Sequence, residues 1–99
     1  MFRKKLKRIS REVIGYLKIR GINARDADEL TMIVSYGYSK LEQCDWYMSL
    51  LRSGDKKYVV PQSLEELKSI RDEIKSVLDE ISSQPAFRRR GSVQGYPDT

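Results

Sequence analysis

Apolar residues follow helical spacing along most of the chain, and the first run predicts a helix over residues 1–22. Its apolar positions are Phe2, Leu6, Ile9, Val13 and Leu17, with Tyr16 on the same arc. Basic residues take the opposite side: Arg3, Lys4, Lys7, Arg8, Arg11 and Lys18. Gly15 weakens this helix, and Gly21 is the expected C-terminal stop. The pattern therefore predicts a basic amphipathic N-terminal helix.

A second, longer helix is expected from Asn23, a good N-cap residue, to the Ser53-Gly54 pair. Asp26 would face the positive end of its dipole. Apolar and small residues step alternately by three and four along it: Ala27, Leu30, Val34, Gly37, Leu41, Cys44, Met48 and Leu51. This spacing is typical of a helix that packs along one continuous seam against another helix.

The third helix follows a short connector that contains the β-prone run Tyr58-Val59-Val60. Ser63 and Glu66 have the spacing of a capping box, which starts the helix at Leu64, and the segment from Ser82 to Pro85 ends it. Its own seam is Leu67, Ile70, Ile74, Val77 and Ile81. Two seams joined by a short connector predict an antiparallel helical hairpin over residues 23–83, followed by a flexible basic tail over residues 84–99.

The expected fold class is all-α, with the basic helix, the long hairpin and assembly into an oligomeric ring. One partner helix covers little of the aromatic surface of the second helix, so we expect self-association to bury that surface. The expected oligomer interface is Leu30, Val34, Gly37, Leu41, Cys44, Met48, Leu51, Trp46 and Tyr47. Trp46 and Tyr47 are more often packing or interface anchors than ligand-stacking residues.

Composition excludes most catalytic chemistry. The 99 residues include no histidine and one cysteine, Cys44, so histidine-dependent catalysis, histidine-ligated metals and a disulfide framework lack their residues. Cys44 is expected to be a small buried residue and Asp45 to lie near an interface, whereas the other carboxylates of these helices are expected to be solvated. We expect no enzyme activity, no cofactor and no metal. No apolar run is long enough to span a membrane, which indicates a soluble protein of a reducing cytoplasm.

The net charge of +5 is unevenly distributed. Residues 1–22 hold eight basic residues and one acid, which is a net +7. The basic face of the first helix is therefore a candidate for DNA phosphates, through Arg3, Lys4, Lys7, Arg8, Arg11 and Lys18. A solvated face and an anionic membrane surface are the alternatives. Phe87, Arg88, Arg89 and Arg90 form a second cluster, suited to an acidic partner or to phosphates, or else a solubilising tail.

The order of these parts resembles the small subunit of tailed-bacteriophage terminases. The resemblance covers about residues 10 to 90: a first helix, a break at residues 21–26, a long second helix, the Gly54 stop, a third helix and a closing segment at residues 85–90. The long helix with Leu30, Tyr36, Leu41 and Tyr47 is part of this resemblance.

The resemblance implies a ring-forming subunit that is not an enzyme. Such a subunit binds double-stranded viral DNA and regulates the large terminase subunit during genome packaging in the cytoplasm of the infected bacterium. DNA would meet the first helix, and the segment Phe87 to Arg90 would dock the large subunit. The alternative is a small coiled-coil adaptor or inhibitor whose basic helix docks on an acidic protein.

Overall fold

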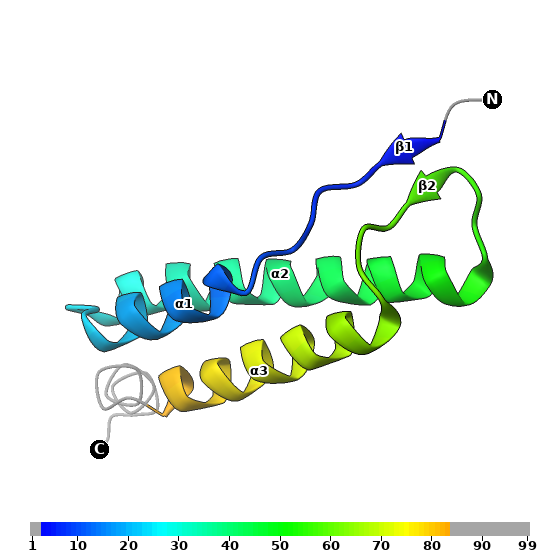
Figure 1. The fold of residues 1–99 in the computed structure, drawn as a ribbon. Helices are drawn as coiled ribbons and strands as arrows, with labels where there is room; N and C mark the ends of the chain where they lie inside the picture. The colour runs from blue at the N-terminus through cyan, green and yellow to red at the C-terminus, as the bar shows by residue number, and fades with distance from the viewer. Residues whose placement is uncertain (1–2, 84–99) are drawn as a thin grey trace, which may run out of the picture.

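The computed structural model describes residues 3–83, which form three helices and two short strands (Figure 1). The helices are α1 (Glu12–Ile22), α2 (Ala27–Ser53) and α3 (Leu64–Ser82). The strands β1 (Lys4–Lys5) and β2 (Tyr58–Val59) pair in parallel. The fold is mostly helical, as expected for the all-α class. The predicted tail over residues 84–99 lies outside the described residues.

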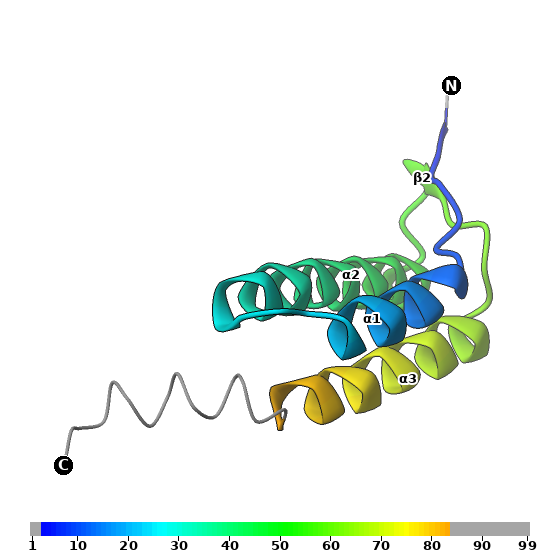
Figure 2. The same cartoon turned by 90° about the vertical axis from the view of Figure 1, so that its left-hand side faces the viewer.

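The core lies between the three helices. Helices α2 and α3 run side by side in opposite directions, and α1 packs against both of them (Figures 1 and 2). The predicted seam of α3 is confirmed, because Leu67, Ile70, Ile74, Val77 and Ile81 are all buried. Leu78, which the seam did not include, is buried with them and meets α2 where Gly37 leaves room for it.

The prediction of a helix over residues 1–22 is wrong for its first half, because α1 begins at Glu12. Residues 3–10 are not helical, and their backbone bonds to other elements of the chain. The Lys4 N–H donates to the Lys57 carbonyl at 2.9 Å, and the Leu6 N–H donates to the Val59 carbonyl at 3.0 Å. A strand ladder with a segment more than fifty residues away thus replaces the helical bonds that the periodicity predicted.

Asn23 and Gly21 have roles other than those predicted. Asp26 is the N-cap of α2, where its carboxylate accepts the Glu29 N–H at 2.8 Å. Asn23 instead ends α1, and its side-chain amide donates to the Ile19 carbonyl at 2.9 Å. Gly21 lies within the helix, pressed against α3.

The other helix boundaries agree with the sequence. Gly54 ends α2 in the left-handed conformation, with φ of 69°, which glycine adopts without strain. The Ser63 hydroxyl accepts the Glu66 N–H at 3.1 Å, so α3 begins at Leu64 as predicted. The β-prone run of the connector supplies β2.

Most residues of the predicted oligomer interface are buried within the single chain. Leu30, Gly37, Cys44, Tyr47 and Met48 are buried, and Val34 and Leu41 pack against the same core. Because α1 and α3 already cover these side chains, they are not available to a second copy. Trp46 and Leu51 are the two members that stay exposed, at 44% and 38%.

Cys44 and Asp45 lie where α2 meets α3. Cys44 is buried, as predicted, and desolvation raises the pKa of its thiol, with a further contribution from the negative charge of Asp45. The Asp45 carboxylate accepts from the Arg71 Nε at 2.7 Å and so links α2 to α3. The expected interface of Asp45 is therefore one between helices of the same chain.

Candidate nucleic-acid interface

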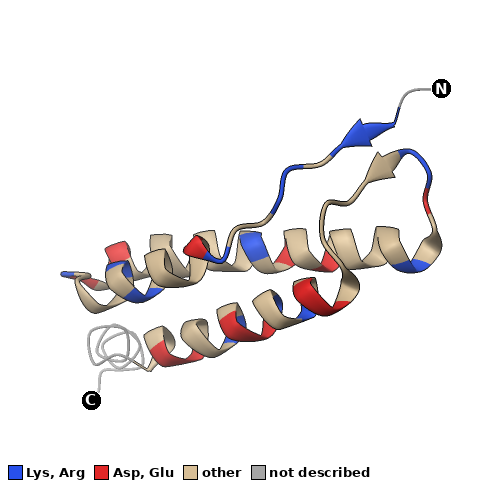
Figure 3. Cartoon of the chain, viewed as in Figure 1, with Lys and Arg blue, Asp and Glu red and all other residues tan. Residues whose placement is uncertain are grey.

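Two lysine-rich segments far apart in the sequence meet at one end of the molecule. Lys4 pairs with Tyr58 and Lys5 with Val59 in the ladder, which brings residues 3–5 beside residues 56–57. We call the cations of this unit the basic arm: Arg3, Lys4, Lys5, Lys56 and Lys57. Figure 3 shows these basic segments together at the end of the ladder that projects from the helices.

The lysines of the basic arm are available to an anion. All four are exposed, and no ion pair is found for any of them among residues 3–83. Asp55 precedes them in the turn before β2, where its carboxylate accepts the Lys57 N–H at 2.7 Å. The four lysines of the basic arm therefore keep their ammonium groups free, and the carboxylate of the neighbouring Asp55 is bonded to a backbone N–H instead.

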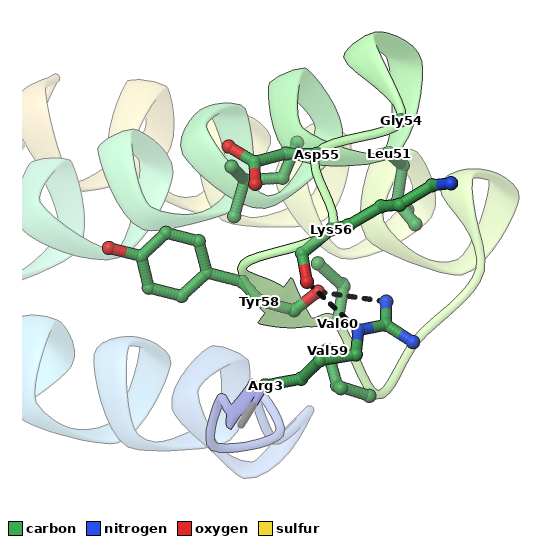
Figure 4. A pocket seen from close by; sticks show the side chains of 9 residues that line it. Arg3, Leu51, Gly54, Asp55, Lys56, Tyr58, Val59 and Val60 are labelled. Carbon is green, nitrogen blue, oxygen red and sulfur yellow. Dashed lines mark hydrogen bonds between the residues drawn. The ribbon is translucent and has the colours of Figure 1, made fainter. Parts of the chain in front are cut away.

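The Arg3 side chain links the two strands by hydrogen bonds to backbone carbonyls. Its Nε donates to the Lys56 carbonyl at 3.0 Å and its Nη2 to the Tyr58 carbonyl at 3.3 Å (Figure 4). Beside it lies an open groove of about 590 Å³ whose lining includes Leu50, Leu51 and Tyr58. Arg3 thus adds charge to the arm and also holds its shape.

The segment that follows β1 is anchored to the core by side chains. The buried amide of Gln62 accepts the Ile9 N–H at 2.9 Å and donates to the Ile9 carbonyl at 2.8 Å. The Tyr47 hydroxyl donates to the Lys7 carbonyl at 2.6 Å. These contacts fix the direction in which the basic arm leaves the helices.

Two of the predicted DNA-binding residues are engaged by acids of α3. Arg8 pairs with Glu66 and also donates to the Pro61 carbonyl at 3.3 Å. Arg11 pairs with Glu73 at 2.5 Å and donates to the Ser69 hydroxyl at 2.7 Å. The hydrogen bond from Arg11 lowers the pKa of the Glu73 carboxyl, so the carboxylate stays charged and neutralises the guanidinium.

The remaining predicted residues are divided between two places. Lys4 and Lys7 are exposed near the strand ladder, whereas Lys18 lies farther along α1 in a groove that also contains Glu73 and Glu80. The six predicted residues therefore do not share one helical face. Reasoning from the sequence missed Lys5, Lys56 and Lys57, although the Lys56-Lys57 doublet directly before the β-prone run was a visible signal.

Other kinds of site are not seen in residues 3–83. That part of the chain has no cluster of three or more acidic or cysteine side chains that would hold a metal ion. It also has no helix with the length and apolar character needed to cross a membrane. The predicted docking residues Phe87 to Arg90 lie outside the described residues.

Comparisons with protein-family models, with curated proteins and with solved structures found no match for this chain.

Proposed function

We propose that this protein binds DNA through the basic arm. The observation that carries the proposal is the ladder between β1 and β2, which gathers five cations from two distant segments onto one projecting unit. Clustered lysines neutralise phosphates and release counterions, which gives affinity without reading the base sequence. The arm replaces the amphipathic helix as the DNA-binding element.

The more specific role that we propose is that of a terminase small subunit. Its support is the resemblance in the order of the helices, together with the basic arm. In this role the helical hairpin of α2 and α3 is the scaffold, and the basic arm presents double-stranded viral DNA to the large terminase subunit. The segment from Phe87 to Arg90 is the proposed docking element for that subunit.

A ring of such subunits needs a surface that the folded chain leaves open. Large apolar side chains are exposed on the outer faces of α1 and the first half of α2, with Ile19 at 62% and Met32 at 74%. The rings of Tyr16 on α1 and Tyr36 on α2 contact each other there, with centroids 5.2 Å apart. We propose this face, in place of the buried seam, for contact between copies.

Matched charge reversals test DNA binding by the arm. Lys4→Glu/Lys57→Glu removes two free cations from the arm, whereas Lys68→Glu/Lys75→Glu makes the same change in net charge on exposed positions of α3. Measured by fluorescence anisotropy with a labelled duplex, the arm variant should bind roughly tenfold to a hundredfold more weakly than the α3 variant. Equal affinities for the two variants would refute the arm as the DNA site.

The same assay addresses an acidic protein as the arm's partner. If wild-type protein bound neither duplex nor single-stranded DNA at moderate salt, DNA binding would be refuted, and the adaptor function would become the better account of the basic arm.

A further inference from the structure

An exposed tryptophan lies beside the basic arm. Trp46 on α2 is 44% exposed and contacts Tyr47 on its own helix and Tyr58 on β2. Its ring centroid lies 5.3 Å from that of Tyr58, and the two rings meet edge to face at 73°. Tyr47 is buried and hydrogen-bonded through its hydroxyl, so the indole rests on a fixed neighbour. An apolar ring this large is therefore held in place while much of it faces solvent.

The strand register places a cation of the basic arm beside Tyr58. Lys4 is directly opposite Tyr58 in the ladder, and residues opposite each other carry their side chains on the same side of the strand pair. Tyr58 also lines the groove that contains Arg3 and Lys56. Tyr58 thus contacts Trp46 on one side of the fold and lies next to cations of the basic arm.

This combination suits DNA with unpaired bases. In a duplex each base face is stacked on its neighbours, so a protein ring beside the backbone meets phosphates and groove edges but no base face. In a single strand the bases are free to stack on aromatic side chains while the backbone follows the cations. Such stacking does not depend on which base is present.

We propose that Trp46, supported by Tyr58, stacks an unpaired base of single-stranded DNA whose phosphates bind the lysines of the basic arm. The inference rests on the proposed DNA binding and extends it from duplex to single-stranded DNA. It also gives Trp46 a ligand-stacking role in place of the packing or oligomer-interface role expected from the sequence.

Trp46 reports directly on this contact because it is the one tryptophan of the chain. The experiment titrates the 99-residue chain with an oligothymidylate strand and with a duplex of equal length, following tryptophan fluorescence and the anisotropy of labelled DNA together. The single strand should quench Trp46 over the concentration range in which it binds. The duplex should bind without that quenching.

Substitutions separate stacking from packing. Trp46→Leu should weaken single-strand binding by about tenfold and leave duplex affinity within twofold, whereas Trp46→Phe, which keeps a ring, should stay within about threefold of wild type for both. Tyr38→Leu is the matched control, since Tyr38 is a half-exposed aromatic residue eight positions earlier on α2, about 12 Å along the helix. It should change neither affinity.

The outcomes distinguish this inference from the proposed function. Single-strand binding without quenching, or equal loss in Trp46→Leu and Trp46→Phe, overturns base stacking while DNA binding by the arm stands. Absence of binding to either DNA overturns the proposed function itself, and the inference with it.

Discussion

Gln62 shows at the scale of one residue how a side chain decides where a helix begins. Its buried amide bonds to both the N–H and the carbonyl of Ile9, and so serves that residue as a neighbouring strand would. The apolar period from Phe2 to Leu17 predicted a helix through Ile9, and Ile9 is indeed buried. Nothing near Ile9 in the sequence indicates that its backbone partner lies 53 positions away.

Replacing the Gln62 amide should destabilise the protein. Gln62→Met keeps the length of the side chain but leaves both Ile9 backbone groups without this partner, and we expect a loss of about 2 to 3 kcal/mol in the free energy of unfolding by urea. Gln43→Met is the control, because it removes two half-buried side-chain bonds, one to Tyr47 at 3.2 Å and one from Lys40 at 3.5 Å, and should cost about 1 kcal/mol or less. Equal losses would contradict the anchoring role of Gln62.

The pairing of Glu73 with Arg11 predicts a dependence of stability on pH. Because the pKa of Glu73 is lower in the folded protein than its ordinary 4.5, the charged carboxylate stabilises the fold above that pH. Its contribution is lost as the pH falls through the folded-state pKa. In urea unfolding at a series of pH values, wild type should therefore exceed Glu73→Gln in stability at pH 7, and the difference should shrink below pH 4.5. A difference that stayed constant down to pH 3 would contradict this pairing.

At the scale of the element, the sequence predicted those features of the helices that depend on residues close to one another in the chain. The Ser63 cap, the Gly54 stop and the seam of α3 could all be predicted, because each depends on residues within a few turns. The strand ladder could not be predicted, since two-residue strands carry no periodicity and their pairing is set by contacts across the fold. The candidate site was predicted only in part for the same reason, because two of its five cations, Lys56 and Lys57, come from the connector.

Helix α1 contains two glycines whose surroundings differ. Gly15 is exposed and a Cβ there would meet no atom within 4 Å, whereas a Cβ on Gly21 would lie 2.6 Å from Cγ1 of Ile81. Ile81 is buried and β-branched, so it has little freedom to move away. Sequence alone cannot separate these glycines, because the difference arises from the approach of α3.

Alanine substitutions at these two positions should have opposite effects. Gly15→Ala should stabilise the protein by about 0.5 to 1 kcal/mol through helix propensity. Gly21→Ala should destabilise it by about 1 to 3 kcal/mol through overpacking against Ile81. Thermal unfolding of the two variants beside wild type measures both effects, and a change of the same sign in both would contradict the packing of α1 on α3.

At the scale of the whole molecule, charge and apolar surface are segregated. The basic arm projects from one end, while acids such as Glu66 and Glu73 line α3 and neutralise the arginines nearest to it (Figure 3). Most of the seam residues predicted for assembly are buried in the core of the single chain. We therefore propose the exposed residues of α1 and α2 described above as the contact between copies in a ring.

Light scattering after size exclusion tests assembly through that face. Wild type should form a closed oligomer of roughly eight to ten chains that persists at high salt, because an apolar interface is not screened. Ile19→Glu/Met32→Glu should reduce it to smaller species, whereas Leu64→Glu, at an exposed apolar position on α3, should not. A wild-type monomer would refute the ring, and an unchanged oligomer in the double variant would refute this interface.

The salt dependence of DNA affinity tests the central claim, binding of phosphates by the basic arm, most directly. If all five cations of the arm contact phosphates of a duplex, the logarithm of the binding constant should fall against the logarithm of salt concentration with a slope of about −4 to −5. In Lys4→Glu/Lys57→Glu the slope should flatten by about 2, and in Lys68→Glu/Lys75→Glu it should stay at the wild-type value. A wild-type affinity that did not change with salt, or the same slope in all three proteins, would contradict the account.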